Sequence, residues 1–181
     1  MQPIGENHPL RRHFSAVVEH AFCTEVGMCD PRLTDYLSDL LVNFTHIDTL
    51  NTLRRIRGKR LEQVATILAG VFGEEGGTGP HRDMTLYRHI GDFTLFWAGM
   101  YPEHLRRDVS LSADCLHEYV ARGKRSYGIV ADLARPDDVP PRDLFQHLSE
   151  DFEYCLHGLG IVRKEWEHPE RRPHGESDLI L

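Results

Sequence analysis

The spacing of apolar residues near the C-terminal end of the chain is the strongest constraint on the fold. Between positions 145 and 166 they recur three and four residues apart in turn, as Phe145, Leu148, Phe152, Cys155, Leu159, Val162 and Trp166. This alternation brings all seven side chains to one face of an α-helix, whereas a half-buried strand needs a period of two. The pattern predicts one long amphipathic helix over residues 142–167, with Gly158 and Gly160 as the positions where it would kink.

The same periodicity predicts helices through the rest of the chain. Asp30 followed by Pro31 is typical of a helix start, because aspartate caps the first turn and proline fits its first position. The glycine-rich segment 73–83 and the proline-rich segment 135–143, which overlaps the start of the last helix, are expected to be loops. The predicted helices cover about residues 9–26, 30–47, 50–72, 86–100, 112–134 and 142–167.

These elements predict an all-α fold, a single-domain bundle of five to seven helices. Residues 1–168 would form the helical domain and residues 169–181, which are polar and rich in proline, a flexible C-terminal tail.

The composition limits the class of function. Of the 181 residues 40% are hydrophobic, which is enough for a core, and the formal net charge is -7. An acidic chain is a poor non-specific binder of nucleic acid or of an anionic membrane surface. The N-terminal residues lack the apolar segment of a secretory signal, and the apolar stretch at about residues 93–101 is too short to span a bilayer. We therefore expect a soluble, cytoplasmic protein with reduced, mostly buried thiols at Cys23, Cys29, Cys115 and Cys155.

A polar pair stands at the front of the most apolar predicted helix. His89 and Asp92 lie three positions apart, so they share one face of the helix. In one interpretation Asp92 is a satisfied core charge, bonded to an arginine or to a helix end elsewhere in the fold, and Arg88, four residues earlier, could pair with it. In the other, the two residues form a general base with its orienting acid, or two ligands of a metal. We favour the first interpretation, because buried charges are more often paired than catalytic.

Small residues beside Asp92 predict that a second helix approaches closely. Gly91, Thr94 and Ala98 follow one stripe, and Gly123 lies on the apolar stripe of the next predicted helix. Such stripes permit close packing of two helices, or they leave room for a flat ligand. We therefore predict a candidate ligand pocket between these helices, lined by His89, Asp92, Phe96, Gly123 and Tyr127.

Two alternatives come from other side chains. The chain has 12 histidines, which leaves open a metal- or haem-binding helical protein with redox activity, for which the weak candidate ligands are His13, His20, His46 and His89. The second alternative is an anion or nucleic-acid binder that uses two basic clusters. We favour solvated faces for these clusters and do not expect a nucleic-acid partner; their residues are Arg54, Arg55, Arg57, Lys59, Arg60, Arg122, Lys124 and Arg125.

Two consecutive segments, YRHIGDFTLFWAGMYPEHL and YVARGKRSYGIVADL, form a recognisable pattern. It consists of Gly91-Asp92, Leu95-Phe96, Gly99 and Pro102-Glu103, followed by Gly123 and Ser126-Tyr127. Over about residues 87–133 the chain resembles a family of uncharacterised bacterial helical proteins. The resemblance implies a helical fold and draws attention to residues 91–127. It implies no activity, cofactor or catalytic residue.

The main hypothesis is a small helical binding or interaction module. The chain has no nucleophile elbow, no phosphate-binding loop with its lysine and no dinucleotide fingerprint after a strand. We therefore assign no catalytic residue and lean toward a protein without catalysis of its own. A protein partner or a second copy of the chain is compatible with such a module.

Overall fold

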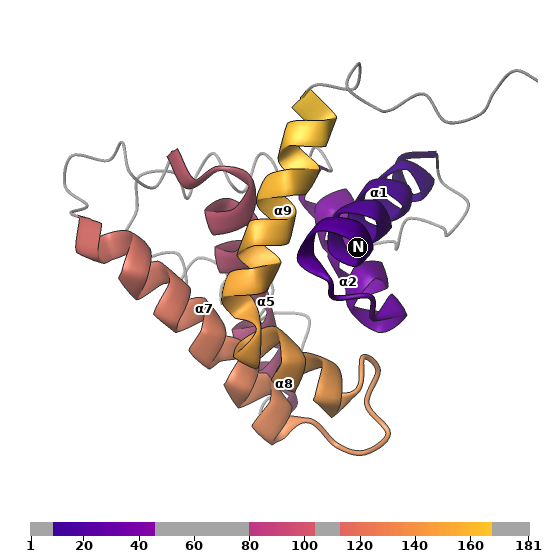
Figure 1. The fold of residues 1–181 in the computed structure, drawn as a ribbon. Coiled ribbons are helices and arrows are strands. Elements are labelled where there is room, and N and C mark those ends of the chain that lie inside the picture. Colours follow the sequence, from indigo (N-terminus) through magenta and orange to yellow (C-terminus); the bar gives the residue numbers. More distant parts are fainter. Residues whose placement is uncertain (1–8, 46–79, 104–112, 168–181) are drawn as a thin grey trace, which may run out of the picture.

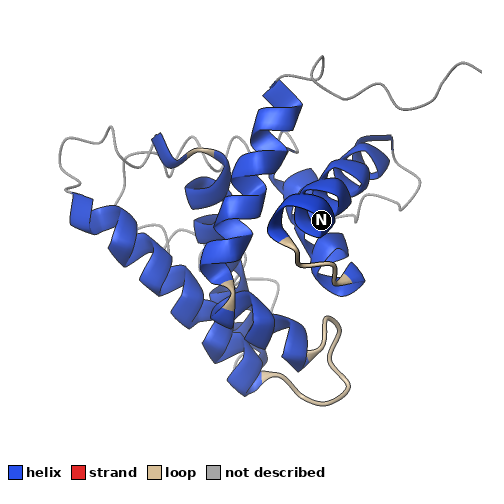
Figure 2. Cartoon of the chain, in the orientation of Figure 1, coloured by secondary structure: helices blue, strands red, loops and turns tan. Residues whose placement is uncertain are grey.

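The computed structural model describes residues 9–45, 80–103 and 113–167, and within these ranges the chain is helical and has no strand (Figures 1 and 2). The all-α prediction is therefore confirmed. The predicted helix over residues 50–72, the predicted tail and the domain boundary lie outside the described residues. The elements are α1 (Pro9–His20), the π-helical segment η1 (Ala21–Val26), α2 (Pro31–Thr45), α5 (Pro80–Met100), α7 (Ala113–Leu133), α8 (Arg142–Glu150) and α9 (Phe152–Glu167).

Helix α5 connects the two sides of the bundle. It packs along α7 and α9 and also contacts α2. In Figure 1, α1 and α2 lie together on one side of α9, and α7 lies on the other. Glycines allow the close contact of α5 with α7, because a Cβ on Gly91 would lie only 2.7 Å from Cε1 of Tyr127. None of the described helices has the length and apolar character needed to cross a membrane.

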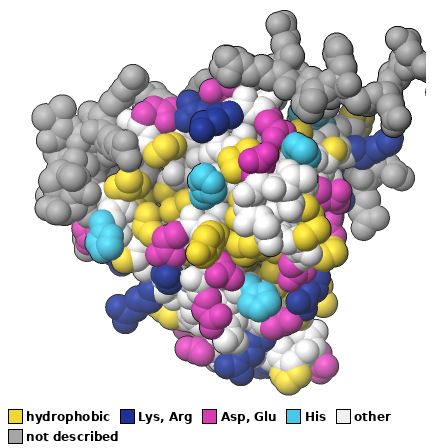
Figure 3. All heavy atoms as spheres, viewed as in Figure 1, with side chains coloured by type: hydrophobic (Ala, Val, Ile, Leu, Met, Phe, Trp, Pro, Cys, Tyr) yellow, Lys and Arg dark blue, Asp and Glu magenta, His cyan; other side chains and the backbone are white. Residues whose placement is uncertain are grey.

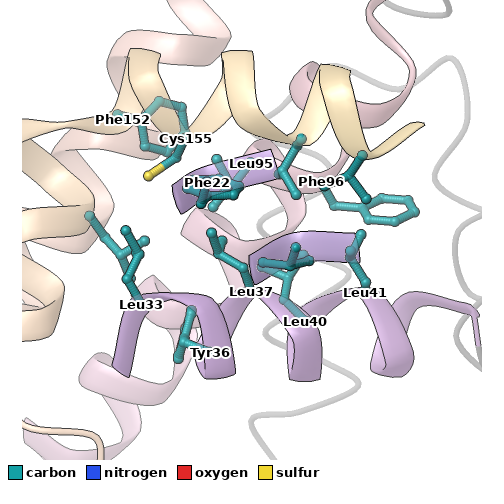
Figure 4. Packing of buried hydrophobic residues seen from close by; sticks show 14 of the residues in the cluster. Phe22, Leu33, Tyr36, Leu37, Leu40, Leu41, Leu95, Phe96, Phe152 and Cys155 are labelled. Atoms are coloured by element: carbon teal, nitrogen blue, oxygen red, sulfur yellow. The ribbon is translucent and has the colours of Figure 1, made fainter. Parts of the chain in front are cut away.

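The predicted apolar faces meet in one continuous core. In Figure 4 the leucines of α2 lie opposite Phe22 of η1, Leu95 of α5 and Cys155 of α9. On α8 and α9 the residues of the three–four pattern are buried up to Val162, whereas Trp166 at the end is 36% exposed. The periodicity therefore identified the buried face of α8 and α9.

The start of α2 also agrees with the sequence pattern. Pro31 is its first residue, and the backbone N–H of Arg32 donates to Oδ1 of Asp30 over 2.9 Å. The preceding η1 ends at Gly27, whose φ of 79° is a conformation that glycine adopts without the usual steric cost.

Two predicted boundaries are wrong. Helix α5 begins at Pro80, so the end of the predicted loop 73–83 is helical; the proline there opens a helix, as its fixed φ allows. The helix predicted over residues 142–167 is divided at Asp151, whose φ of -101° and ψ of 24° leave the helical region. The break does not occur at Gly158 or Gly160. The N–H of Asp151 still donates to the carbonyl of His147, so the apolar register continues across the break and the periodicity does not reveal it.

The prediction of reduced thiols is wrong for two cysteines. Cys23 and Cys29 form a disulfide that joins η1 to the segment before α2. The turn at Gly27 brings the two residues together, a reversal that their spacing of six does not show. Cys155 is a buried free thiol, as predicted, and burial raises its pKa to about 12.

Candidate functional site

Asp92 joins three helices. It lies on α5 with its side chain 15% exposed, and its Oδ1 accepts two phenolic hydrogen bonds. Tyr36 of α2 donates over 2.5 Å and Tyr127 of α7 over 2.7 Å. A carboxylate taken from water needs such donors, because its desolvation is otherwise costly. Asp92 is therefore a satisfied charge, as the favoured interpretation predicted, but its hydrogen-bond partners are two tyrosines and not the arginine or helix end that was expected.

Arg88 stands beside this carboxylate, one helical turn earlier on α5. Its Nε donates to the hydroxyl of Tyr36 over 3.2 Å and lies 3.9 Å from Oδ2 of Asp92. The guanidinium lies over the ring of Tyr36 at 5.2 Å and that of Phe145 at 5.8 Å, within the range of cation–π attraction. Arg88, Tyr36 and Asp92 thus form a continuous polar chain between α5 and α2.

The protonation states follow from burial and from these charges. Burial raises the pKa of Tyr36 and of Tyr127 well above the ordinary value, and the negative charge of Asp92 raises it further. Both phenols therefore stay protonated and act as donors. Burial lowers the pKa of His89, the charge of Arg88 lowers it further, and Asp92 opposes both. His89 is therefore neutral near pH 7.

A hollow of about 220 Å³ opens above this polar chain. It lies between α2, α5 and the segment that leads into α8. Tyr36, Arg88 and Asp92 contribute to its lining together with the acidic and basic side chains of α2 and an apolar wall. The complete lining is Arg32, Asp35, Tyr36, Asp39, Leu40, Asn43, Arg88, Asp92, Val139, Pro140, Pro141 and Leu144.

Some of the lining charges are already used in ion pairs. Arg32 contacts Asp143 at 2.5 Å and Asp30 at 3.3 Å. The backbone N–H of Arg32 at the start of α2 also donates to Oδ1 of Asp30 and holds this group in place. Arg11 of α1 lies 2.6 Å from Asp39. The charges of the rim are therefore partly neutralised, while those of Arg88, Asp92 and Asp35 remain next to the hollow.

The space predicted between α5 and α7 is filled by side chains. Of the predicted pocket residues, Asp92 and Tyr127 are hydrogen-bonded, but Tyr127 is fully buried. Phe96 is 3% exposed and stacks on Phe44 at 4.5 Å. Around Gly123 an added Cβ would lie 2.6 Å from Cζ of Phe152, so the glycine serves close packing. His89 is partly buried and is not among the residues that line the hollow. The hollow lies instead on the α2 side of Asp92.

The sequence analysis did not identify Tyr36 as a site residue, although its position among the leucines of α2 was unusual for a residue with a hydroxyl group. Tyr36 falls between Leu33, Leu37 and Leu40 on the buried side of α2. A tyrosine at such a position usually brings its hydroxyl to a polar partner. Asp92 was the unexplained charge in the same chain, but no signal in the sequence connects the two positions. The apolar wall from Val139 to Leu144 had no comparable signal.

The candidate metal ligands do not converge within the described part of the chain. There, no group of three or more histidine, cysteine, aspartate or glutamate side chains is placed to hold a metal ion. His13 and His20 lie on α1, and His89 lies on α5. His46 lies outside the described residues.

The basic clusters are only partly described. Arg54, Arg55, Arg57, Lys59 and Arg60 lie outside the described residues. On α7, Lys124 forms an ion pair of 2.9 Å with Glu153, while Arg122 is partly buried and Arg125 is exposed. On the face seen in Figure 3, the described acidic and basic side chains are interspersed.

Comparison with known proteins gives no match to a family model, a curated protein or a solved structure. The resemblance to uncharacterised bacterial helical proteins therefore stays a prediction.

Proposed function

We propose that this protein is a helical binding module whose small ligand occupies the hollow above Asp92 and Arg88. The observation that carries the proposal is the combination of a concave space with charged groups fixed at its base. Asp92 is held by two phenols and Arg88 by Tyr36 and the ring of Phe145, so neither side chain needs to reorganise when a ligand arrives. Such preorganisation favours binding, because less conformational freedom is lost.

The composition of the hollow also fits a binding site. Ligand sites combine apolar walls with a few polar groups at fixed positions. Here Leu40, Leu144 and the segment from Val139 to Pro141 supply the apolar wall. Val139 is 92% exposed, so this wall is open to solvent on one side.

The proposal favours recognition over general acid–base chemistry at Asp92. Its Oδ1 already accepts two hydrogen bonds, and its Oδ2 lies beside the positive charge of Arg88. These contacts already engage both oxygens of the carboxylate, so a proton-transfer role would have to disrupt them. An electrostatic role toward a bound ligand uses the same groups without proton transfer.

Blocking the hollow tests the proposal. Asn43 lines it, is exposed and lies outside the core, so Asn43→Trp should fill the space without disturbing the fold. Amide chemical shifts of the labelled full chain would be followed during titration with small amines, acids, amino acids and neutral amides. We expect shifts at residues 32–43, 88–92 and 139–144 in the wild type, and none in the variant.

The matched control is Gln146→Trp, an equally large change at an exposed position of α8 that does not line the hollow. This variant should bind as the wild type does, and circular dichroism should show the same helix content in all three proteins. Absence of shifts in the wild type, or shifts that persist in Asn43→Trp, would reject the hollow as a binding site.

A further inference from the structure

Charged groups of both signs line the hollow, and two of them, Arg88 and Asp92, lie side by side with Nε 3.9 Å from Oδ2. Nε of Arg88 donates to Tyr36, but its two terminal nitrogens make no hydrogen bond with another residue in the described ranges. Asp35 likewise has no ion pair or hydrogen bond with another described side chain, and it lines the same hollow. Arg32 and Asp39 are already engaged in ion pairs with other residues. The charged groups that remain in the lining of the hollow are the guanidinium of Arg88 and the carboxylates of Asp35 and Asp92.

These groups complement a ligand that carries a carboxylate and an ammonium group together. A guanidinium fork binds a carboxylate through two parallel hydrogen bonds. An ammonium group needs acceptors, which Asp35 and Oδ2 of Asp92 offer. A ligand with a single charge would meet a like charge on one side of the hollow, and that repulsion disfavours it.

The size and the wall of the hollow restrict this ligand further. About 220 Å³ is less than the roughly 300–1,000 Å³ of sites for drug-sized molecules, so the occupant is small. Leu40, Leu144 and the prolines at positions 140 and 141 provide an apolar surface beside the charges. An aliphatic side chain on the ligand would bury its surface there.

We infer that the ligand is a small zwitterion, an α-amino acid with an aliphatic side chain, whose carboxylate binds the terminal nitrogens of Arg88 and whose ammonium group binds Asp35 and Oδ2 of Asp92. The inference rests on the proposed function, because it names the class of ligand for the same hollow. It assigns Arg88 to the negative end of the ligand and Asp35 to the positive end.

Three probes that share one side chain separate the two charges. L-Leucine carries both, isocaproate only the carboxylate and isoamylammonium only the ammonium group. Titration of the labelled full chain, read from the amides that line the hollow, gives a dissociation constant for each probe. We expect L-leucine to bind at least about tenfold more tightly than either relative, because each charge-assisted contact contributes on that scale.

Two variants then assign each end of the ligand. Asp35→Asn should weaken the binding of L-leucine and isoamylammonium several-fold, whereas isocaproate should bind at least as tightly as before, because a like charge is removed. Arg88→Lys should weaken L-leucine and isocaproate and leave isoamylammonium unchanged, because lysine keeps the charge but loses the fork. Asp35 is exposed, so its variant remains informative even if the change at Arg88 disturbs the fold.

The outcomes separate this inference from the proposed function. If isocaproate or isoamylammonium binds in the hollow as tightly as L-leucine, the zwitterion inference is overturned while the binding site stands. If L-leucine leaves the amides of the hollow unshifted, the inference is also overturned. The binding site itself falls only if no other probe shows binding that Asn43→Trp abolishes.

Discussion

At the scale of single residues, Asp92 shows how a charge is accommodated in an apolar helix. Its neighbours on α5 are Ile90 and Phe93, 4% and 5% exposed. Tyr36 and Tyr127 supply two hydrogen bonds to one oxygen, and Arg88 supplies a positive charge near the other. The residue therefore stabilises the contact of α2, α5 and α7 and also brings a negative charge to the hollow.

Asp92→Asn should destabilise the protein by about 2 kcal/mol. The amide of asparagine keeps an oxygen acceptor for the two phenols. The substitution removes the negative charge that faces Arg88, and it places an N–H donor near the guanidinium of Arg88, which is itself a donor. Urea unfolding followed by circular dichroism would measure the loss. Asp39→Asn is the matched control, since Asp39 is 53% exposed and its pair with Arg11 lies at the surface. Its cost should stay below about 1 kcal/mol, and equal losses for the two variants would contradict this account of Asp92.

At the scale of elements, glycines decide how closely the helices pack. Gly158 and Gly160 lie two residues apart on α9, but their surroundings differ. A Cβ on Gly158 would overlap the ring of Phe22 in η1, whereas a Cβ on Gly160 would have its nearest neighbour, the carbonyl oxygen of Gly99, at 3.9 Å. Gly158 is thus required by the contact between α9 and η1, and Gly160 is not.

The pair offers a comparison within one helix. Gly158→Ala should cost about 1–3 kcal/mol, because the ring of Phe22 is buried and has little room to move. Gly160→Ala should stabilise the protein by up to about 1 kcal/mol, because alanine is the better helix former and the space is free. Thermal and urea unfolding would measure both changes. If both substitutions lowered the free energy of unfolding by a similar amount, the contact of Gly158 with η1 would not be the cause of the destabilisation.

At the scale of the whole molecule, α5 joins the other helices by contacting α2, α7 and α9. The two tyrosines that donate to Asp92 belong to α2 and α7, so the carboxylate joins both of these helices to α5. Their ionisation would place negative charges beside Asp92, at side chains that are 6% (Tyr36) and 0% (Tyr127) exposed. The stability of the bundle is therefore coupled to their protonation.

This coupling predicts a loss of stability in alkali. Because the folded-state pKa of Tyr127 is raised above the unfolded value of about 10, its contribution is complete below that pH and is lost as the pH rises. Urea midpoints measured between about pH 8 and pH 11 should fall less steeply in Tyr127→Phe than in the wild type. Tyr154→Phe, at a tyrosine that is 61% exposed, should follow the wild type. Identical pH profiles for all three proteins would contradict the coupling.

The sequence by itself determined the helices and their buried faces. Apolar periodicity depends on the local geometry of 3.6 residues per turn, so it can be read without knowledge of neighbours. This is why the core residues from Phe145 to Val162 were predictable, and why Asp92 stood out as a charge that needed partners. Local signals were weaker at boundaries: Pro80 was assigned to a loop, and the break at Asp151 left the periodicity intact.

Only the tertiary structure decided which of these faces meet. The partners of Asp92 lie 56 and 35 positions away, and the hollow combines side chains of α2 and α5 with the segment before α8. Such contacts depend on how the helices pack against each other, and spacing within one helix does not specify them. For the same reason the predicted pocket between α5 and α7 is closed by Phe152 and Thr94 around Gly123, and the open space lies on the other side of Asp92.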